Sequence, residues 1–277
     1  MELLYGRPVA DAILNTVREG ITDTDVVPGL AVVLVGNDPA SHLYVRLKEK
    51  AAQEIGMHFE KYIFSEVDPE EIILKKIEEL NAAEHIHGII VQVPLPVEFN
   101  TDKIIAAINP RKDADGFHPK TVEGFLSGDV SMIPVFPDAL LELARSSGKG
   151  LSGLLGVTVV NSEYFGSVML QAMKNSGIMG RMVMVNGFTN GDASIDDADI
   201  IFSACGIPRM IQMHHVKEGA ILIDGGIAKQ GEKMLGDVDA ESVASKALFL
   251  TPVPGGVGPV TIACLLRRTL LLSQKER

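Results

Sequence analysis

Two hydrophobic patterns alternate along the first half of the chain. Continuous apolar runs, typical of strands covered on both faces, occupy residues 29–35 and 88–93, and residues 58–64 form a third predicted strand. Apolar residues three and four apart, typical of amphipathic helices, occupy residues 41–55 and 69–80 between these strands. This order of strand, helix and strand predicts an α/β domain with a parallel sheet.

The second half of the chain repeats the alternation. A helix is predicted at residues 166–174, directly after the first strand of this half, and a Pro/Gly turn that starts at residue 252 leads into an apolar helix ending at 272. The pattern predicts strands at 157–160, 182–185, 200–204 and 220–224.

The remaining segments predict the organisation around these two halves. Apolar positions at helical spacing predict a helix at residues 8–17 and another at 138–145. Residues 109–128, rich in Asp, Gly, Pro and Lys, are predicted to form a long functional loop. Residues 146–150 have the composition of a flexible joint.

Composition and charge narrow the function. The 277 residues suit one large or two modest domains, and 46% hydrophobic residues supply a sizeable core. The net charge of −11, the lack of tryptophan and the 5% aromatic content argue against binding to nucleic acids and anionic membranes. Two cysteines, Cys205 and Cys264, without a CxxC motif indicate a reducing compartment. With no signal peptide or membrane span recognisable, we expect a soluble cytoplasmic protein.

Tyr44 and Lys48 are the first candidate chemical pair. They are four residues apart on a predicted helix, so both lie on one face. There the phenol and the ammonium can shift each other's pKa and act as a proton-transferring pair. An ordinary surface pair with no role has the same spacing. Short-chain dehydrogenases also contain Tyr-x-x-x-Lys, but there it follows a glycine-rich nucleotide loop, whereas here it comes near the start of the chain.

Three further polar positions lie where α/β proteins bind ligands. Gln92 is at the carboxyl end of a predicted strand, although a lone glutamine there is often structural. Asp113 and Asp115 lie in the segment RKDADGFHP, where they suit either turn formation or hydrogen bonds to amino groups of a ligand. A hard cation needs more oxygen ligands than these two residues provide, so a ligand is favoured over a metal.

A glycine-rich turn and the histidines complete the candidates. The turn Gly255-Gly256-Val257-Gly258-Pro259 opens the last helix and lets the backbone approach a ligand, although Pro259 and Thr261 are also ordinary helix starters. The histidines lack cysteine or acidic partners at ligand spacing and are interpreted as structural or surface residues, so no metal ligand is assigned. This interpretation concerns the two closely spaced pairs among the seven histidines, His85-x-His87 and His214-His215.

Five segments together resemble the bifunctional methylenetetrahydrofolate dehydrogenase/methenyltetrahydrofolate cyclohydrolase (FolD) family: DPASHLYVRLKEKA, GIIVQVPLP, RKDADGFHP, GDVD and TPVPGGVGPVTIACLL. The resemblance implies an α/β fold of two domains in a homodimer. A catalytic folate domain would comprise residues 1–137 plus 258–277, with the last helix returning to it, and a Rossmann-like NAD(P)-binding domain residues 138–257.

The same resemblance implies the activity and the folate site. Methylenetetrahydrofolate would be oxidised to the methenyl form, which would then be hydrolysed to 10-formyltetrahydrofolate without a metal. Lys48 matches the catalytic lysine, Tyr44 the tyrosine that packs on the folate, Gln92 the glutamine that tunes the lysine and Asp115 the aspartate that bonds the pterin. The implied substrate-binding residues also include Val91, Val93, Gly255, Gly256, Gly258 and Pro259.

The nucleotide half departs from the family pattern. The family's Gly-Arg-Ser turn is replaced by Val160-Asn161-Ser162, and its His-Ser-Arg run by Asn186-Gly187-Phe188, so two cations are missing. Glu163 adds a negative charge at a helix start. The family's Pro-Cys-Thr-Pro becomes PVFP at 134–137. The cofactor residues implied by the resemblance are Val160, Asn161, Ser162, Gly166, Ile227 and Thr261.

These departures leave several hypotheses open. The resemblance implies NADP as the cofactor, and its binding would persist if backbone contacts carry the site. NAD would be preferred if the lost cations recognised the 2′-phosphate, and no cofactor would bind if the dehydrogenase has been lost. In the last case the protein is a cyclohydrolase only. A non-catalytic folate-binding or regulatory protein is the alternative from another class, against which the retained Tyr44, Lys48, Gln92 and Asp115 speak.

Overall fold

The computed structural model describes residues 1–231 and 233–275, and the chain divides into two compact units. The first unit comprises Asp11–Gly124 and Ile262–Arg277, and the second comprises Met1–Ala10 and Phe125–Thr261. The division falls inside three helices: α1 (Gly6–Thr22), α5 (Pro119–Leu126) and α10 (Val257–Lys275).

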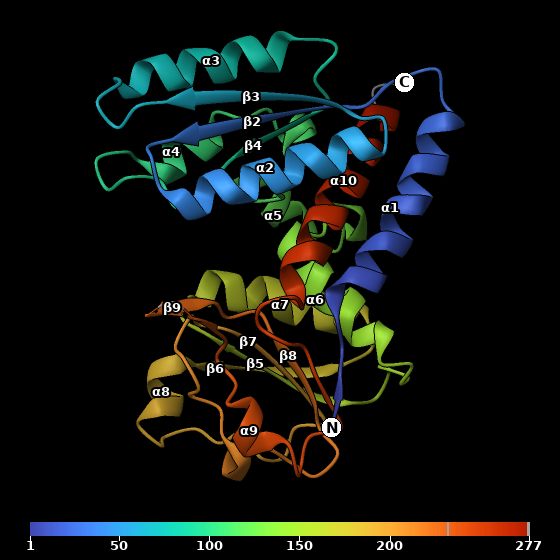
Figure 1. Cartoon of the computed structure of the whole chain (residues 1–277), viewed down its shortest axis with the longest axis vertical. Coiled ribbons are helices and arrows are strands. Elements are labelled where there is room, and N and C mark those ends of the chain that lie inside the picture. Colours follow the sequence, from blue (N-terminus) through green and yellow to red (C-terminus); the bar gives the residue numbers. More distant parts are fainter. Residues whose placement is uncertain (232, 276–277) are drawn as a thin grey trace. The chain divides into compact units, whose positions relative to one another are not determined.

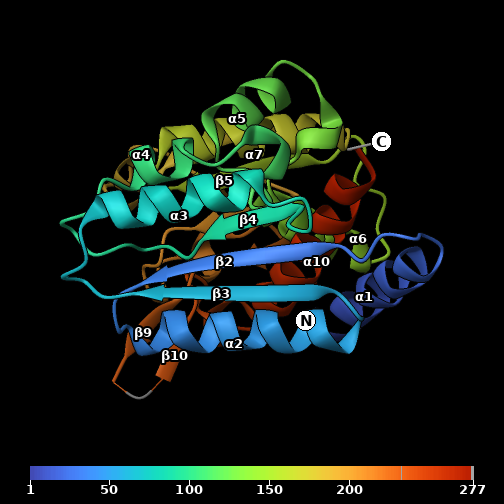
Figure 2. The same cartoon turned by 90° about the horizontal axis from the view of Figure 1, so that it is seen from above.

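The first unit is built on a three-stranded parallel sheet (Figures 1 and 2). β2 (Gly29–Val35) lies in the centre, between β3 (His58–Phe64) and β4 (Gly88–Val91). Every residue of β2 is buried, which explains its uninterrupted apolar sequence, since a central parallel strand is covered on both faces.

Helices cover both faces of this sheet. Ala31, Val33 and Val35 of β2 pack with apolar residues of α3 (Glu70–Ala82) and α4 (Thr101–Ala106). The opposite face receives α2 (Pro39–Glu54) and the last helix, α10. Because successive side chains of a strand point to opposite faces, each helix layer meets every second residue of the sheet.

The second unit contains a six-stranded parallel sheet of the Rossmann type. The strand order is β1-β11-β8-β7-β5-β6. The chain runs from β5 to its neighbour β6 and then crosses to the other side of β5 to form β7, so the sheet has a topological switch point between β5 and β7. The strands are β1 (Glu2–Leu3), β5 (Leu155–Val160), β6 (Met179–Met184), β7 (Ile200–Ala204), β8 (Ile221–Asp224) and β11 (Phe249–Leu250).

Gly166 sets how closely a helix lies on this sheet. It lies in α7 (Glu163–Asn175), the helix between β5 and β6. A Cβ atom added to Gly166 would lie 2.0 Å from Met182 Sδ and 3.0 Å from Val160 Cγ2. The glycine therefore permits a close contact between helix and strand, which is one of the roles of glycine in dinucleotide-binding folds.

The other elements of the second unit are short, apart from one helix. That helix is α6 (Val135–Ser146), and the others are α8 (Val185–Thr189), α9 (Ala240–Val243) and the hairpin β9 (Ala228–Gln230) with β10 (Lys233–Leu235). Three 3₁₀ turns complete the described elements of the chain: Pro110–Lys112, Val130–Met132 and Met213–His215.

Most sequence-predicted elements are confirmed, and one is wrong. The strands predicted at 29–35, 58–64 and 200–204 have the observed bounds. The long loop predicted at 109–128 contains the helix α5, because Val122 and Phe125 pack into the interior. Among the described residues, no helix combines the length and apolarity that crossing a bilayer requires.

Candidate active site

Lys48 lies on the inner face of α2. The helix starts at Pro39, directly after Gly36-Asn37-Asp38. The Asp38 side chain accepts a hydrogen bond from Ser41 N at 2.7 Å, and Pro39 lies in the first turn. The buried stripe of α2 consists of Ser41, Val45, Lys48 and Ala52. Lys48 thus occupies a position that an apolar residue would normally fill, and it is 9% exposed.

Gln92 holds the ammonium group of this lysine. It directly follows β4, and its backbone N–H donates to Val33 O at 2.8 Å. The Lys48 Nζ donates to Gln92 Oε1 at 2.8 Å. The Gln92 Nε2 donates to Val93 O at 2.8 Å, which fixes the amide so that its oxygen faces the lysine.

Asp115 lies in a loop that the fold holds tightly. The neighbouring Asp113 is 1% exposed, and its carboxylate accepts hydrogen bonds from the backbone N–H groups of Gly116 and His118, both at 3.0 Å. Arg268 of α10 donates from Nε to Asp113 O at 3.0 Å. The two aspartates therefore differ: Asp113 shapes the loop, whereas Asp115 is partly exposed.

Burial and charge act in opposite directions on Lys48 and Asp115. Burial lowers the pKa of Lys48, and the negative charge of Asp115 partly offsets this. Burial raises the pKa of Asp115, and the Lys48 charge opposes that rise. These effects bring the lysine closer to a neutral amine near physiological pH than a surface lysine is.

The remaining folate-side candidates surround this group. Tyr44 is partly buried one helical turn before Lys48, on the same side of α2. Val91 is the buried last residue of β4, and Val93, partly exposed, follows Gln92. The first unit thus brings together Lys48, Gln92 and Asp115. Tyr44 lies on the same helix as Lys48, and Val91 and Val93 flank Gln92 in the chain.

The carboxyl ends of the second unit's strands hold the nucleotide-side candidates. Asn161 directly follows β5 and Cys205 directly follows β7, the two strands at the switch point. The exposed Asn161 side chain donates from Nδ2 to Cys205 O at 3.4 Å, so it bridges the place where open α/β sheets bind ligands.

Three other candidates have mainly structural contacts. Val160 is 0% exposed and its side chain lies next to Gly166, so any contact with a cofactor would come from its backbone. The Ser162 side chain caps α7 by accepting from Phe165 N at 3.4 Å. Glu163 starts that helix, as predicted, and adds a negative charge to its first turn.

Two buried carboxylates support the neighbouring loops, and sequence reasoning gave them no role. Asp237, 0% exposed, accepts from the N–H groups of Cys205 and Ile207, both at 2.8 Å. Asp224 accepts from Gly226, Asp237 and Val238 N–H groups, and burial raises its pKa to about 7. The sequence signal that could have pointed to Asp237 is the GDVD motif, in which it lies.

The glycine turn and Ile227 also belong to the second unit. Gly255 is exposed with a φ of 104°, and Gly256 is buried, while Gly258 and Pro259 are partly exposed in the first turn of α10. The Thr261 hydroxyl donates to Val257 O at 3.1 Å, within the helix. Ile227 is 43% exposed, shortly after β8.

Arg268 is a site-supporting residue that sequence reasoning missed. It is 8% exposed, among buried apolar residues of α10, and it ties this helix to the loop that carries Asp115. The signal was present in the sequence, since a charged residue in an apolar helical stripe needs a partner.

The comparisons with known proteins agree with this arrangement. Residues 4–115 match the family model "Tetrahydrofolate dehydrogenase/cyclohydrolase, catalytic domain", and residues 134–277 match that of the NAD(P)-binding domain. The chain belongs to this family.

Individual members resemble it along their whole length. The "Bifunctional protein FolD" of Methanosarcina acetivorans is 37% identical over 282 residues, covering 99% of this chain and 97% of that protein. The crystal structure of FolD from Campylobacter jejuni has a TM-score of 0.92, 33% identity and full coverage of both chains. The Trypanosoma brucei FolD structure, complexed with NADP cofactor and inhibitor, has a TM-score of 0.91, 29% identity and coverage of 99% and 97%.

Membership confirms several predictions made from the sequence. The protein has the two-unit α/β fold of FolD structures with a Rossmann-like sheet. It is an enzyme of the methylenetetrahydrofolate dehydrogenase/cyclohydrolase class, in folate one-carbon metabolism, and its second unit is an NAD(P)-binding domain. A cyclohydrolase without a nucleotide site and a non-catalytic binding protein are not favoured.

Proposed function

We propose that Lys48 is the proton-transferring residue of the hydrolysis and that Gln92 sets its basicity and orientation. The observation that carries this proposal is the 2.8 Å hydrogen bond between Lys48 Nζ and Gln92 Oε1 on the buried face of α2. A lysine in that environment has a lowered pKa, so a fraction of it is a neutral amine that can accept a proton.

The hydrolysis follows from the chemistry of the substrate. The methenyl carbon is an electrophilic amidinium-type centre, which a water molecule attacks while Lys48 accepts a proton from the water. Breaking of one carbon–nitrogen bond then opens the ring: the attached hydroxyl becomes the formyl C=O and releases its proton to solvent, while the released nitrogen receives a proton from the lysinium. Each turnover therefore releases one proton to solvent and returns Lys48 to the neutral amine.

Asp115 and Tyr44 position the folate in this proposal. The Asp115 carboxylate, on a loop that Asp113 holds in place, suits the paired N–H donors of a pterin ring, and Tyr44 offers an aromatic face one turn from Lys48. The segment Val91–Val93, with Gly255, Gly256, Gly258 and Pro259, would add contacts to the same substrate. We keep the assignment of residues 1–137 plus 258–277 to folate binding, and of 138–257 to cofactor binding, as part of the proposal.

The cofactor of the dehydrogenase step is proposed to be NAD rather than NADP. When bound, this nicotinamide accepts the hydride from the methylene carbon. Residues 161–166 and 185–191, which follow β5 and β6, contain no lysine or arginine to pair with a 2′-phosphate. Asn161 and Asn186 are exposed at these strand ends and can hydrogen-bond neutral ribose hydroxyls.

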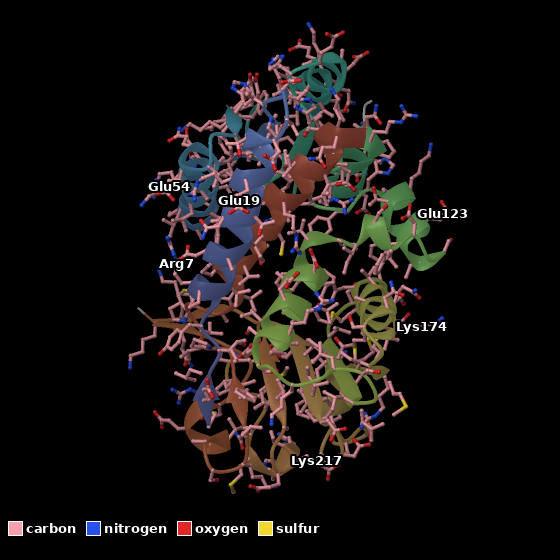
Figure 3. The ribbon with its side chains drawn as sticks, turned by 90° about the vertical axis from the view of Figure 1, so that its right-hand side faces the viewer. Arg7, Glu19, Glu54, Glu123, Lys174 and Lys217 are labelled. Atoms are coloured by element: carbon pink, nitrogen blue, oxygen red, sulfur yellow. The ribbon has the colours of Figure 1, made fainter. Side chains whose placement is uncertain are left out.

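Two basic side chains of the second unit are already paired with acids, which also favours NAD over NADP. Lys217, labelled in Figure 3, pairs with Asp199, which immediately precedes β7. Arg181 pairs with Asp197 and donates to Ser194 O at 2.9 Å. Asp197 and Asp199 precede β7, so these two cations are engaged near the amino ends of strands, opposite the nucleotide site. Ser162, Gly166, Ile227 and Thr261 would contact NAD mainly by backbone or by packing.

A spectrophotometric assay of the purified protein tests these proposals together. Methylenetetrahydrofolate is supplied with NAD or NADP in parallel, and methenyltetrahydrofolate is supplied alone. We expect faster reduction of NAD together with rapid methenyl hydrolysis. A preference for NADP would overturn the cofactor proposal, and hydrolysis without any reduction would indicate a cyclohydrolase only. We also propose a homodimer, which sedimentation analysis would show as twice the mass of 29.7 kDa.

A further inference from the structure

Three side chains that can bind a metal ion converge in the first unit, at the end of the sheet opposite to Lys48. His58 and Glu60 alternate on β3, so they share one face of the strand, and His85 precedes β4. Lys48 and Gln92 meet beyond the carboxyl end of β4, whereas His58 and His85 lie at the amino ends of β3 and β4. Sequence spacing could not reveal this group, because Glu60 and His85 are 25 residues apart.

The ligand atoms of the three residues already point at one another. His58 Nε2 lies 2.8 Å from Glu60 Oε1, and His85 Nε2 lies 3.0 Å from the same oxygen. Within residues 1–231 and 233–275, this is the one group of three potential ligands whose atoms all lie within 4.8 Å of one another. A tetrahedral zinc ion with bonds near 2.0–2.1 Å separates its ligands by roughly 3.3 Å, so only small shifts would admit it.

The site is also supported by the residues around it. The Tyr62 hydroxyl donates to Glu60 Oε2, which leaves Oε1 directed at the two histidines. Hydrogen bonds of this kind orient metal-ligating carboxylates. The pKa of Glu60 is lowered to about 2, chiefly by the Tyr62 bond and further by both histidines, so the carboxylate is charged at any physiological pH.

The backbone holds His85 in place through Gly29, the first residue of β2. The Gly29 N–H donates to His87 Nδ1 at 3.0 Å, and His87 N donates to Gly29 O at 2.8 Å. A Cβ atom on Gly29 would lie 2.0 Å from His85 O, so only glycine allows this approach. The buried His87 is therefore structural, as predicted, and it fixes the segment that carries the exposed His85.

We propose that His58, Glu60 and His85 form a surface site for a divalent transition-metal ion such as Zn²⁺, with the remaining coordination positions open to water. Two imidazoles and one carboxylate are a donor set that zinc, nickel and copper prefer, whereas calcium and magnesium prefer oxygen ligands. Each imidazole would bind the ion through Nε2 in the neutral tautomer that carries its proton on Nδ1.

Binding would join two strands that do not pair with each other. β3 and β4 each pair with β2, so a metal held by His58, Glu60 and His85 would link segments on both sides of the central strand. We therefore expect the ion to raise the melting temperature of the protein, because a ligand that binds only the folded state stabilises it.

Isothermal titration of the full-length protein with Zn²⁺, after dialysis against a chelator, tests the proposal. We expect one ion per chain with micromolar affinity, and no comparable binding of Ca²⁺. His85→Gln and Glu60→Gln should each weaken the affinity by about tenfold or more and abolish the Zn²⁺-dependent rise in melting temperature. Because His85 is largely exposed, its replacement should leave folding and the cyclohydrolase rate intact.

A matched variant excludes unspecific binding by surface histidines. His214 and His215 form another histidine pair, with ring centroids 3.8 Å apart. His214→Gln should bind Zn²⁺ as the unaltered protein does. The proposal is overturned if no stoichiometric binding occurs, or if His85→Gln binds Zn²⁺ with unchanged affinity.

Discussion

The proposed folate side and the nucleotide side of this enzyme differ in their charged groups. On the folate side, a buried lysine shares a hydrogen bond with a glutamine and an electrostatic interaction with an aspartate. On the nucleotide side, the segments that directly follow β5 and β6 contain no lysine or arginine, while Gly166 packs closely and helix α7 is capped. A reaction centre depends on particular protonating groups, whereas a Rossmann site can keep its shape while its charges change.

Removing the charged group of the folate side should have the largest effect. Lys48→Met is expected to lower kcat for methenyl hydrolysis by ~1000-fold, because general acid–base catalysis is lost. Lys50→Met on the same helix is the control, since the side chain of Lys50 is 74% exposed. The decay of methenyl absorbance measures both rates, and a Lys48→Met enzyme with near-normal kcat would refute the assignment.

Changing the partner of Lys48 should have a smaller effect with a characteristic pH dependence. Gln92→Glu places a negative charge beside Lys48 Nζ and raises the lysine pKa, so the neutral amine forms only at higher pH. We expect about a tenfold loss of hydrolysis at neutral pH that is partly recovered in alkaline buffer. Gln53→Glu, an exposed change on the same helix, should leave the pH profile in place. An unshifted profile for Gln92→Glu would count against Lys48 as the base.

Adding a cation to the nucleotide side should shift the cofactor preference towards NADP. Asn186→Arg is expected to raise the ratio of kcat/KM for NADP to that for NAD by about tenfold, since guanidinium pairs strongly with phosphate. Asn175→Arg is the control, because Asn175 is the last residue of α7 and does not follow the carboxyl end of a strand. Steady-state kinetics with both cofactors measure the ratio, and an unchanged ratio would place 2′-phosphate recognition elsewhere.

The smallest effect is expected when the close packing at Gly166 on the nucleotide side is disturbed. Gly166→Ala should lower the free energy of unfolding by ~1 kcal/mol, because the new methyl group forces Met182 to move. Gly187→Ala, also in a helix but with open space around it, should change the free energy by less than about 0.5 kcal/mol. Urea denaturation compares the two, and equal effects would mean that Gly166 is not a packing constraint.

Sequence patterns predicted the fold where burial is uniform. The central strands at 29–35 and 200–204 were found because covered parallel strands are continuously apolar. The helix α5 was missed because its eight residues include a proline and a glycine and resemble a loop. The two-residue strands β1 and β11 carry too short a pattern to be recognised.

The candidate site likewise contains residues that local sequence patterns can suggest and contacts that they cannot. Lys48 and Gln92 could be proposed from their positions on one helix and one strand end, and the structure brings them within hydrogen-bonding distance. The support that Arg268 gives to the Asp113 loop joins residues 155 positions apart. Such a pairing depends on how the last helix packs in the first unit, which no local pattern contains.

Asp237 imposes an order on how the nucleotide site can assemble. Its carboxylate holds the Cys205 and Ile207 N–H groups at the switch point, although it is synthesised 32 and 30 residues after them. The strands β5, β6 and β7 can therefore pair before the loop at their carboxyl ends has its final anchor. In a growing chain that anchor is added only once Asp237 has left the ribosome, so the loop at the switch point is completed late in synthesis.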